Sequence, residues 1–353
     1  MRKGAYLWIF IIFIGLTAAL VGEQIVNRWR PHISYLFKHT PLCIAENLGL
    51  VGIRRAHYSE KTKNTVDVLR CEPAKAPHLI GGPFHHELIV VSDLGGLVQR
   101  FDVLGALVWQ VRLSMPRGID IQDEQVLVGE GKILQVFSLN TGEKLRSVEF
   151  DHSILAFRQV GSNIFILLEG DGRDTIRQYE ISQKEARLIR TSPMHTNYAR
   201  GIDVNSSSVY IADTFGHRII QLDVKTLDLI DQTPSYFPNS VQLSANKMLV
   251  AEEHLNLVSE YNISSLKLLR TRIGCQKNKH LLTRPAAEIS STCTSIDSIK
   301  LYSPNDAVEL EGSVYIADTD NHRILEVFDG RVVGELAGFN NPINIRTIGK
   351  TFN

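Results

Sequence analysis

One segment of fifteen residues occurs twice in this sequence. VYIADTFGHRIIQLD covers residues 209–223, and VYIADTDNHRILEVF covers residues 314–328, with nine identical positions. Four weaker copies keep the same order of an apolar run, an acid, a short turn and a second apolar run. At the position of the alanine in VYIAD, the six copies have Ser92, Gly129, Leu168, Ala212, Ala251 and Ala317. A repeat of this kind predicts a stack of similar structural units.

The repeat length indicates which unit is stacked. Successive copies are 37, 39, 44, 39 and 66 residues apart. Each copy contains short apolar segments joined by turn residues, and the middle segments are apolar at consecutive positions, as expected for strands covered on both faces. Four-stranded sheets repeating at about 40 residues are typical of propeller blades. We therefore expect an all-β fold, a six-bladed β-propeller of four-stranded antiparallel blades; a two-layer sandwich would alternate more clearly.

The two strong copies resemble NHL repeats. Their signature element of Asn, His, Arg and Ile corresponds to residues 321–324, and residues 216–219 carry the same element with Gly for Asn. The resemblance covers about residues 85–348 and implies a six-bladed propeller. It implies no particular chemistry, because this fold serves binding proteins and enzymes alike.

The N-terminal part has a different character. Residues 5–22, AYLWIFIIFIGLTAALVG, carry no charge and nearly span a bilayer core of about 30 Å as a helix. A cleaved signal peptide is the alternative, but its apolar stretch is shorter, about 7–15 residues. We expect one transmembrane helix, a signal anchor. The expected organisation is residues 1–4 as N-terminal flank, 5–22 as membrane anchor, 23–84 as juxtamembrane segment, 85–348 as propeller with an inserted loop at 271–302, and 349–353 as tail.

The sequence offers two candidates for the strand that closes the first blade. Residues 342–348 or, alternatively, residues 64–70 complete this blade as its innermost strand.

The four cysteines fall into two local pairs, Cys43 with Cys71 and Cys275 with Cys293, which are candidate disulfides of an exported domain. We therefore expect a single-pass membrane protein with the propeller on the extracytoplasmic side. For the basic loop that contains Cys275 and Cys293, an unpaired variable loop is the alternative.

The start of each innermost strand supplies the candidate site. Twelve residues before the alanine position lie Arg117, Ala156, Arg200, Asn239 and Asn305. These positions should surround one mouth of the central channel. The candidate ligand-binding residues are Arg117, Arg200, Asn239 and Asn305, which suit a carboxylate, a sulfate or a sugar. The competing structural interpretation pairs Arg117 with Glu130 and Arg200 with Asp213 across adjacent strands.

A second resemblance bears on metals. The segments FPNSVQLSANKMLVAEE and SPNDAVELEGSVYIAD resemble the gluconolactonase, phosphotriesterase and strictosidine-synthase-like propellers. In calcium-dependent members the Asn of such a Pro-Asn pair is a ligand, which on that analogy would make Asn239 and Asn305 oxygen ligands. Calcium needs carboxylates among its ligands, whereas the matching positions here include two arginines. We therefore expect no metal and no cofactor, with calcium only under the hydrolase or lyase alternative.

Other titratable residues have structural explanations. The acids that end the second strands should accept bonds in their hairpins; they are Asp93, Glu130, Glu169, Asp213, Glu252 and Asp318. His217 and His322 should brace those hairpins. His85 and His86 are neighbours that should point to opposite faces, which disfavours a shared metal.

Composition and motifs argue against several classes of function. The formal net charge is zero, with no block of Lys and Arg, which argues against a nucleic-acid partner. Catalytic motifs such as G-x-S-x-G, H-E-x-x-H and a phosphate loop are missing from the sequence. We expect a membrane-anchored, non-enzymatic propeller that binds a protein or a small anionic or sugar ligand outside the cytoplasm. The alternatives are a propeller hydrolase or lyase of the gluconolactonase/strictosidine-synthase type and a scaffold without a small ligand.

Overall fold

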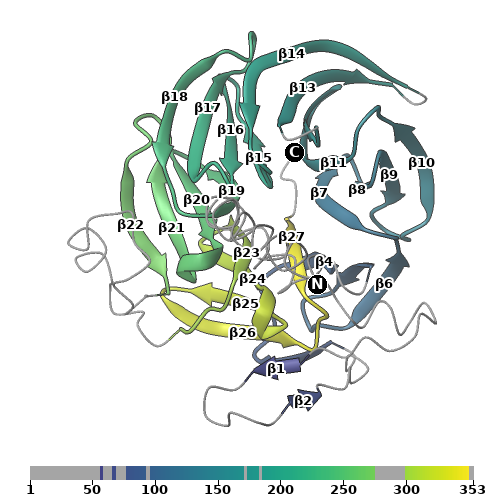
Figure 1. The fold of residues 1–353 in the computed structure, drawn as a ribbon. Helices are drawn as coiled ribbons and strands as arrows, with labels where there is room; N and C mark the ends of the chain where they lie inside the picture. The colour runs from purple at the N-terminus through teal and green to yellow at the C-terminus, as the bar shows by residue number, and fades with distance from the viewer. Residues whose placement is uncertain are drawn as a thin grey trace, which may run out of the picture. The chain divides into compact units, whose positions relative to one another are not determined.

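The computed structural model describes residues 56–58, 66–68, 77–92, 96–170, 173–182, 185–274 and 299–349. The chain divides into two compact units, Met1–Glu72 and Pro73–Asn353. In the first unit, β1 (Ala56–Tyr58) and β2 (Val66–Val68) form an antiparallel pair. The second unit contains six antiparallel sheets arranged around a centre (Figure 1).

Each sheet is one blade, and its strands follow one another from the centre outward, as the sequence pattern predicts. Blade 1 contains β27 (Pro342–Ile348), β4 (Glu87–Ser92), β5 (Leu97–Phe101) and β6 (Leu107–Arg112), and blade 2 contains β7 (Pro116–Gln122), β8 (Gln125–Glu130), β9 (Ile133–Ser138) and β10 (Lys144–Glu149). Blade 3 contains β11 (Ile154–Val160), β12 (Asn163–Leu168), β13 (Asp174–Ile181) and β14 (Ala186–Thr196), and blade 4 contains β15 (Gly201–Val204), β16 (Ser208–Asp213), β17 (Arg218–Asp223) and β18 (Leu229–Pro234). Blade 5 contains β19 (Pro238–Ser244), β20 (Lys247–Glu252), β21 (Leu257–Asn262) and β22 (Leu268–Ile273), and blade 6 contains β23 (Pro304–Leu310), β24 (Ser313–Asp318), β25 (Arg323–Phe328) and β26 (Arg331–Ala337).

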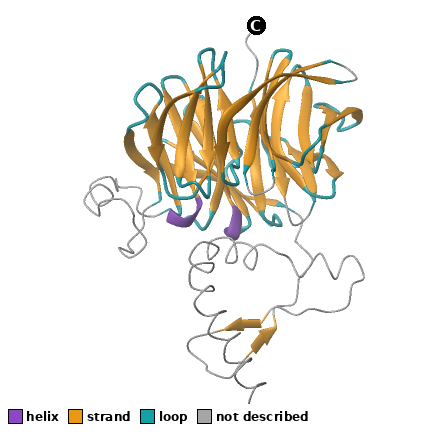
Figure 2. Cartoon of the chain, turned by 45° about the horizontal axis from the view of Figure 1, so that its top comes forward, coloured by secondary structure: helices purple, strands orange, loops and turns teal. Residues whose placement is uncertain are grey.

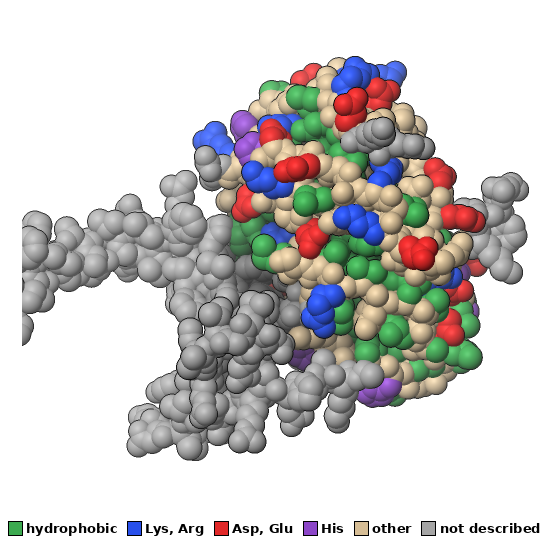
Figure 3. Space-filling model, turned by 90° about the vertical axis from the view of Figure 1, so that its right-hand side faces the viewer, with side chains coloured by type: hydrophobic (Ala, Val, Ile, Leu, Met, Phe, Trp, Pro, Cys, Tyr) green, Lys and Arg blue, Asp and Glu red, His purple; other side chains and the backbone are tan. Residues whose placement is uncertain are grey.

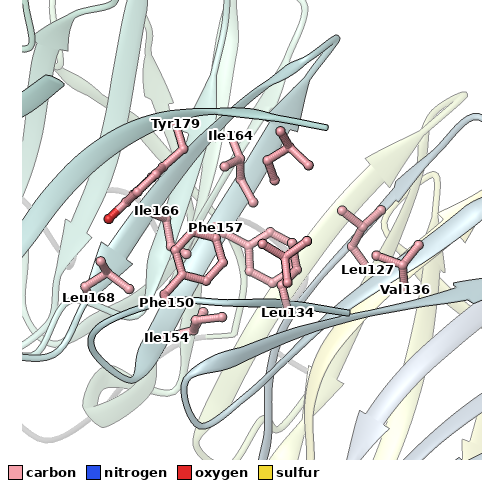
Figure 4. Packing of buried hydrophobic residues seen from close by; sticks show 12 residues of the cluster. Leu127, Leu134, Val136, Phe150, Ile154, Phe157, Ile164, Ile166, Leu168 and Tyr179 are labelled. Carbon is pink, nitrogen blue, oxygen red and sulfur yellow. The ribbon is translucent and has the colours of Figure 1, made fainter. Parts of the chain in front are cut away.

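The core lies between neighbouring blades. Every residue of β16 and of β24 is buried, whereas the outermost strand β18 is mostly exposed. One cluster joins Leu127 and Leu134 of blade 2 to Phe157 and Ile164 of blade 3 (Figure 4). The consecutive apolar positions of the middle strands therefore exist because both faces of each sheet pack against another sheet.

The ring is closed by the last strand. β27 pairs antiparallel with β4, and Ile345 lies opposite Val90. Each innermost strand contacts the next, and β27 also contacts β7. Residues 342–348 thus supply the innermost strand of blade 1, and residues 66–68 from the alternative segment pair with β1 instead. Closure leaves no open edge between the first and last blades, which protects the sheets from pairing with other chains.

Blade 6 departs from the expected four strands. β3 (His78–Gly81) pairs with the outer edge of β26 and forms a fifth strand. The chain therefore joins the propeller before residue 85, the expected boundary. Its four residues, HLIG, fall in the segment 23–84, which was expected to be juxtamembrane.

One face of the second unit carries the short helices. η1 (Glu253–Leu255) and η3 (Thr319–Asn321) follow the second strands of blades 5 and 6 and lie on the same face (Figure 2). The innermost strands begin on this face, because they run antiparallel to the second strands. β22 ends at Ile273 and β23 begins at Pro304, so residues 274–303 connect blades 5 and 6, where an inserted loop was expected at 271–302.

The outer side of the unit has mixed character. Lys and Arg side chains alternate with Asp and Glu among apolar atoms on the side shown in Figure 3. Several outer strands expose apolar side chains, including Leu107, Leu145 and Ile230.

Several expectations fall on other parts of the chain. The apolar run 5–22 and all four cysteines lie outside the described residues. Among the residues that are described, no helix is long and apolar enough to cross a bilayer. The anchor and the two disulfides remain predictions.

Candidate functional site at the start of the innermost strands

The structure brings the four predicted ligand-binding residues into one connected group. Arg117, Asn239 and Asn305 each occupy the second position of an innermost strand, and Arg200 directly precedes β15. Tyr198 and Glu253, which the sequence analysis missed, join them. We call these six residues the mouth cluster: Arg117, Tyr198, Arg200, Asn239, Glu253 and Asn305.

Tyr198 contacts both arginines. Arg117 Nη1 donates a hydrogen bond of 2.8 Å to the Tyr198 hydroxyl. The Cζ atoms of Arg117 and Arg200 are 5.7 Å and 5.0 Å from the centre of the Tyr198 ring, within the range of cation–π contacts. The ring of Tyr198 is thus in contact with the positive charges of Arg117 from blade 2 and Arg200 from blade 4. All three residues are half-buried.

Two buried carboxylates hold the backbone of Tyr198. The residue has a φ of 53°, in the left-handed region that a tyrosine rarely adopts. Asp213 accepts the N–H of Asn197 at 2.7 Å, and Asp174 accepts the N–H of Ala199 at 3.0 Å. Burial raises the pKa of Asp174 to about 6; bonds from the Ala199 and Tyr198 N–H groups oppose the shift, and the nearby charge of Asp213 adds to it. The loop conformation is therefore determined by the surrounding structure.

The other half of the mouth cluster is a chain of amides. Asn239 Nδ2 donates to Glu253 Oε2 and to Asn305 Oδ1, both at 2.9 Å. Asn305 Nδ2 donates in turn to Thr319 Oγ1 at 2.8 Å. Arg200 Nη1 lies 3.5 Å from Glu253 Oε2 and 3.4 Å from Asn239 Oδ1. The guanidinium of Arg200 is thus the cation that faces the oxygens of this group.

The residues of the two expected cross-strand ion pairs, Arg117 with Glu130 and Arg200 with Asp213, have other partners in the structure. Arg117 lies opposite Gly129 in the register, and Glu130 accepts bonds from the Ser114 N–H and from Gln135 Nε2, each at 2.7 Å. Arg200 forms an ion pair with Glu253. A β-bulge near the start of the innermost strand shifts the register by one residue in every blade except blade 4, which simple counting from the alanine cannot show.

The acids that end the second strands have structural partners. Asp213 pairs with Arg218 at 2.7 Å, and Asp318 pairs with Arg323 at 2.8 Å, directly opposite in each hairpin. Burial raises the pKa of both carboxyls, opposed by bonds from backbone N–H groups and from the arginines. Glu252 accepts bonds from Ser235 and Ser259 at 2.8 Å and 2.5 Å. Asp93 lies outside the described residues.

The histidines of the strong repeats occupy a special backbone position. His217 and His322 have φ angles of 53° and 57°, and Asn256 takes the same role in blade 5 with 56°. The His217 ring stacks on Tyr236 at 5.2 Å between centres. These backbone positions place both histidines at the turn between the second and third strands of their blades. Among the described residues, no group of three or more His, Cys, Asp or Glu side chains could hold a metal.

The adjacent histidines His85 and His86 share one network, contrary to the expectation of opposite faces. The His85 ring contacts the buried Glu326 carboxylate, and Tyr315 donates to Glu326 Oε1 at 3.0 Å. The His86 ring bonds the Tyr315 hydroxyl at 2.8 Å. Both residues precede β4, so strand alternation does not apply to them. Their contacts fasten the segment after β3 to blade 6.

Further along the innermost strands than the mouth cluster, Arg158 forms ion pairs with aspartates of the two neighbouring blades. Arg158 of β11 lies 2.8 Å from Asp120 of β7 and 2.7 Å from Asp203 of β15. Burial opposes the charge of Arg158, but the two carboxylates outweigh it and raise the pKa of the guanidinium. Asp120 and Asp203 also accept a backbone N–H from the next blade, from Gln159 and Leu243 respectively. The sequence signal that could have revealed them is the tetrapeptide RGID, present at both 117–120 and 200–203.

Comparisons with known proteins support the fold. No family model and no curated protein match the sequence. The structure is similar to a protein of unknown function from Bacteroides caccae, with a TM-score of 0.59 and 14% identity over 76% of this chain and 100% of that one. It is also similar to a chain in the crystal structure of a nidogen/laminin complex, with a TM-score of 0.55 and 12% identity over 73% and 97% of the two chains. The chain is a β-propeller. At these identities the likeness concerns the fold alone.

Proposed function

We propose that this propeller is a non-enzymatic binding protein that takes up an anionic group at the mouth cluster. The observation that carries the proposal is the placement of Arg117 and Arg200 against the single ring of Tyr198. A guanidinium offers several N–H donors in a plane and suits a carboxylate or a sulfate. With Glu253 counted against them, the two arginines leave one net positive charge in the cluster. The repeat pattern further supports kinship with NHL-like propellers.

A second candidate function is suggested by Glu253. This carboxylate, together with Asn239 and Asn305, supplies the oxygen types that calcium prefers, as in the hydrolase or lyase alternative. The side chains fit a metal poorly, because Arg200 already faces Glu253 and the Oδ1 atom of Asn239. A cation in the same group would meet the guanidinium charge. We therefore place anion binding first.

A binding experiment distinguishes anion binding from the calcium-dependent alternative. Titration calorimetry with sulfate, succinate and glucuronate should detect binding to the wild type, and Arg117→Gln and Arg200→Lys should each weaken it, Arg117→Gln the more because it removes a charge. Arg187→Gln is the matched control, since Arg187 pairs with Glu180 at the exposed outer side. Stoichiometric calcium in purified protein, with no anion bound, would reverse the order of the two functions.

We further propose that residues 5–22 anchor the chain in a membrane with the propeller on the extracytoplasmic side. The charge-free run and the two local cysteine pairs support this arrangement. A reporter active only in the cytoplasm, fused after Asn353, should be inactive. Full reporter activity would refute the orientation.

A further inference from the structure

A group of six aromatic rings continues from the mouth cluster. It is formed by the connection from blade 3 to blade 4 and by loops of blades 4 and 5. We call it the aromatic row: Tyr198, Phe215, Phe237, His254, Tyr236 and His217. Five of the rings are half-buried, and Phe237 is buried.

The rings form a continuous series of contacts. Tyr198 stacks on Phe215 at 5.2 Å between ring centres, and Phe215 meets the edge of Phe237 at 5.7 Å and 84°. Phe237 stacks on His254 at 3.9 Å. Tyr236 meets Phe237 at 5.0 Å and 81°, and stacks on His217. Tyr198 thus belongs to both groups and joins the arginines to the row.

Two ionisable rings of the row are neutral at neutral pH. Burial lowers the pKa of His217, which keeps its imidazole neutral, and burial raises the pKa of Tyr236, which keeps its phenol protonated. The guanidinium charges of Arg117 and Arg200 lie at the Tyr198 end of the row. A ligand that matches it has a negative group at one end and apolar groups beside it.

We propose that the mouth cluster and the aromatic row together bind a polypeptide segment that carries a carboxylate next to apolar or aromatic side chains. This inference rests on the proposed anion-binding function. The carboxylate would meet Arg117 and Arg200, and the neighbouring apolar side chains would pack on Phe215, Tyr236 and His254. Arginine and tyrosine are among the residue types enriched at the centres of protein interfaces.

The ring geometry favours a polypeptide over a saccharide. The half-buried rings of Phe215 and Tyr236 flank the buried Phe237 and offer an apolar surface on which a side chain can pack. A saccharide would need hydrogen-bonding groups along its length, whereas the row beyond Tyr198 offers only the Tyr236 hydroxyl and two imidazoles. Rigid rings also lose little conformational entropy on binding, which favours affinity.

The test uses two acetylated octapeptides, one with an aspartate two residues before a phenylalanine and one with glycine replacing that phenylalanine. Binding of each is measured by fluorescence anisotropy to the wild type, Tyr236→Ala, Arg117→Gln and Tyr302→Ala. Tyr302 is the matched control, because its exposed ring lies outside the row. We expect Tyr236→Ala to weaken the first peptide about ten-fold, as for a central interface aromatic, and to leave the second unchanged. Arg117→Gln should weaken both.

Each other outcome has a definite meaning. If Arg117→Gln weakens both peptides but Tyr236→Ala affects neither, the aromatic row is not a binding surface and anion binding stands. If neither peptide binds and small anions do not bind either, the proposed function fails as well. Tighter binding of an oligoglucuronate than of the first peptide, lost in Tyr236→Ala, would assign the row to a saccharide instead. Melting curves of every variant establish that it is folded.

Discussion

Asp318 and Arg323 lie opposite each other where β24 and β25 begin their hairpin, with Oδ2 and Nε 2.8 Å apart. Asp318 is fully buried, and Arg323 is mostly covered. Asp213 and Arg218 repeat the pair in blade 4. The strongest part of the sequence repeat is therefore a pair of buried ionic contacts that hold two hairpins.

Removal of one partner of the buried Asp318–Arg323 pair should lower the stability of the protein. Arg323→Ala leaves the Asp318 carboxylate buried beside only its backbone and Asn321 donors, and we expect the free energy of unfolding to fall by about 3 kcal/mol. Urea denaturation followed by tryptophan fluorescence measures the change. Arg187→Ala, at an exposed pair with Glu180, should cost less than about 1 kcal/mol. Equal losses in the two variants would show that burial of the pair has no importance.

Asp174 should give stability a dependence on pH. Its folded pKa is raised from 3.8 to about 6, so the native state binds a proton more tightly than the unfolded state. The stabilisation from that proton is fully present below pH 4 and is lost as the pH rises through 6, by about 3 kcal/mol in total. Asp174→Asn should remove this fall. Unfolding free energies of both proteins between pH 4 and pH 7 test the difference, and parallel profiles would contradict it.

Closure by β27 should be essential for a cooperative fold. A chain that ends at Asn341 exposes the inner edge of β4 and the flank of β23, and we expect a lower melting temperature and soluble aggregates. Thermal melts and size-exclusion chromatography detect both. A chain that ends at Gly349 retains β27 and is the control. Monomeric behaviour and an unchanged melt for the shorter chain would show that the ring needs no closing strand.

The disulfide between Cys275 and Cys293 remains a prediction. Closing a loop of this length would stabilise the protein by about 3 kcal/mol in the chain-entropy model. Mass spectrometry of a non-reduced digest of protein exported by its own cell should find the linked peptides. Free thiols at both positions would remove the disulfide and weaken the argument for export.

The blade pattern was readable because it repeats. The expected four-stranded blades match the six sheets of the propeller, and residues 342–348 coincide with β27. β3 escaped notice because four residues that pair with an outer edge carry no repeat signal. Stacking of sheets dictates long apolar runs, whereas an added edge strand needs only backbone hydrogen bonds.

The candidate site was readable only in part. Arg117, Arg200, Asn239 and Asn305 stand at equivalent repeat positions, so their convergence followed from the fold. Tyr198 and Glu253 lie in a connecting loop and in η1, where the repeat does not constrain the residue type. Their roles depend on contacts between blades, such as the bond from Arg117 to Tyr198, that sequence spacing cannot reveal.

The pairing of Ile345 with Val90 also sets an order of events during synthesis. Blade 1 has three of its strands near the beginning of the propeller and the fourth at its end. Blades 2 to 5 can each form as soon as their own residues leave the ribosome. Blade 1 must wait until about residue 348 has emerged, so its inner edge stays unpaired while most of the propeller is made. During that interval, the inner edge of β4 is open to pairing with other chains.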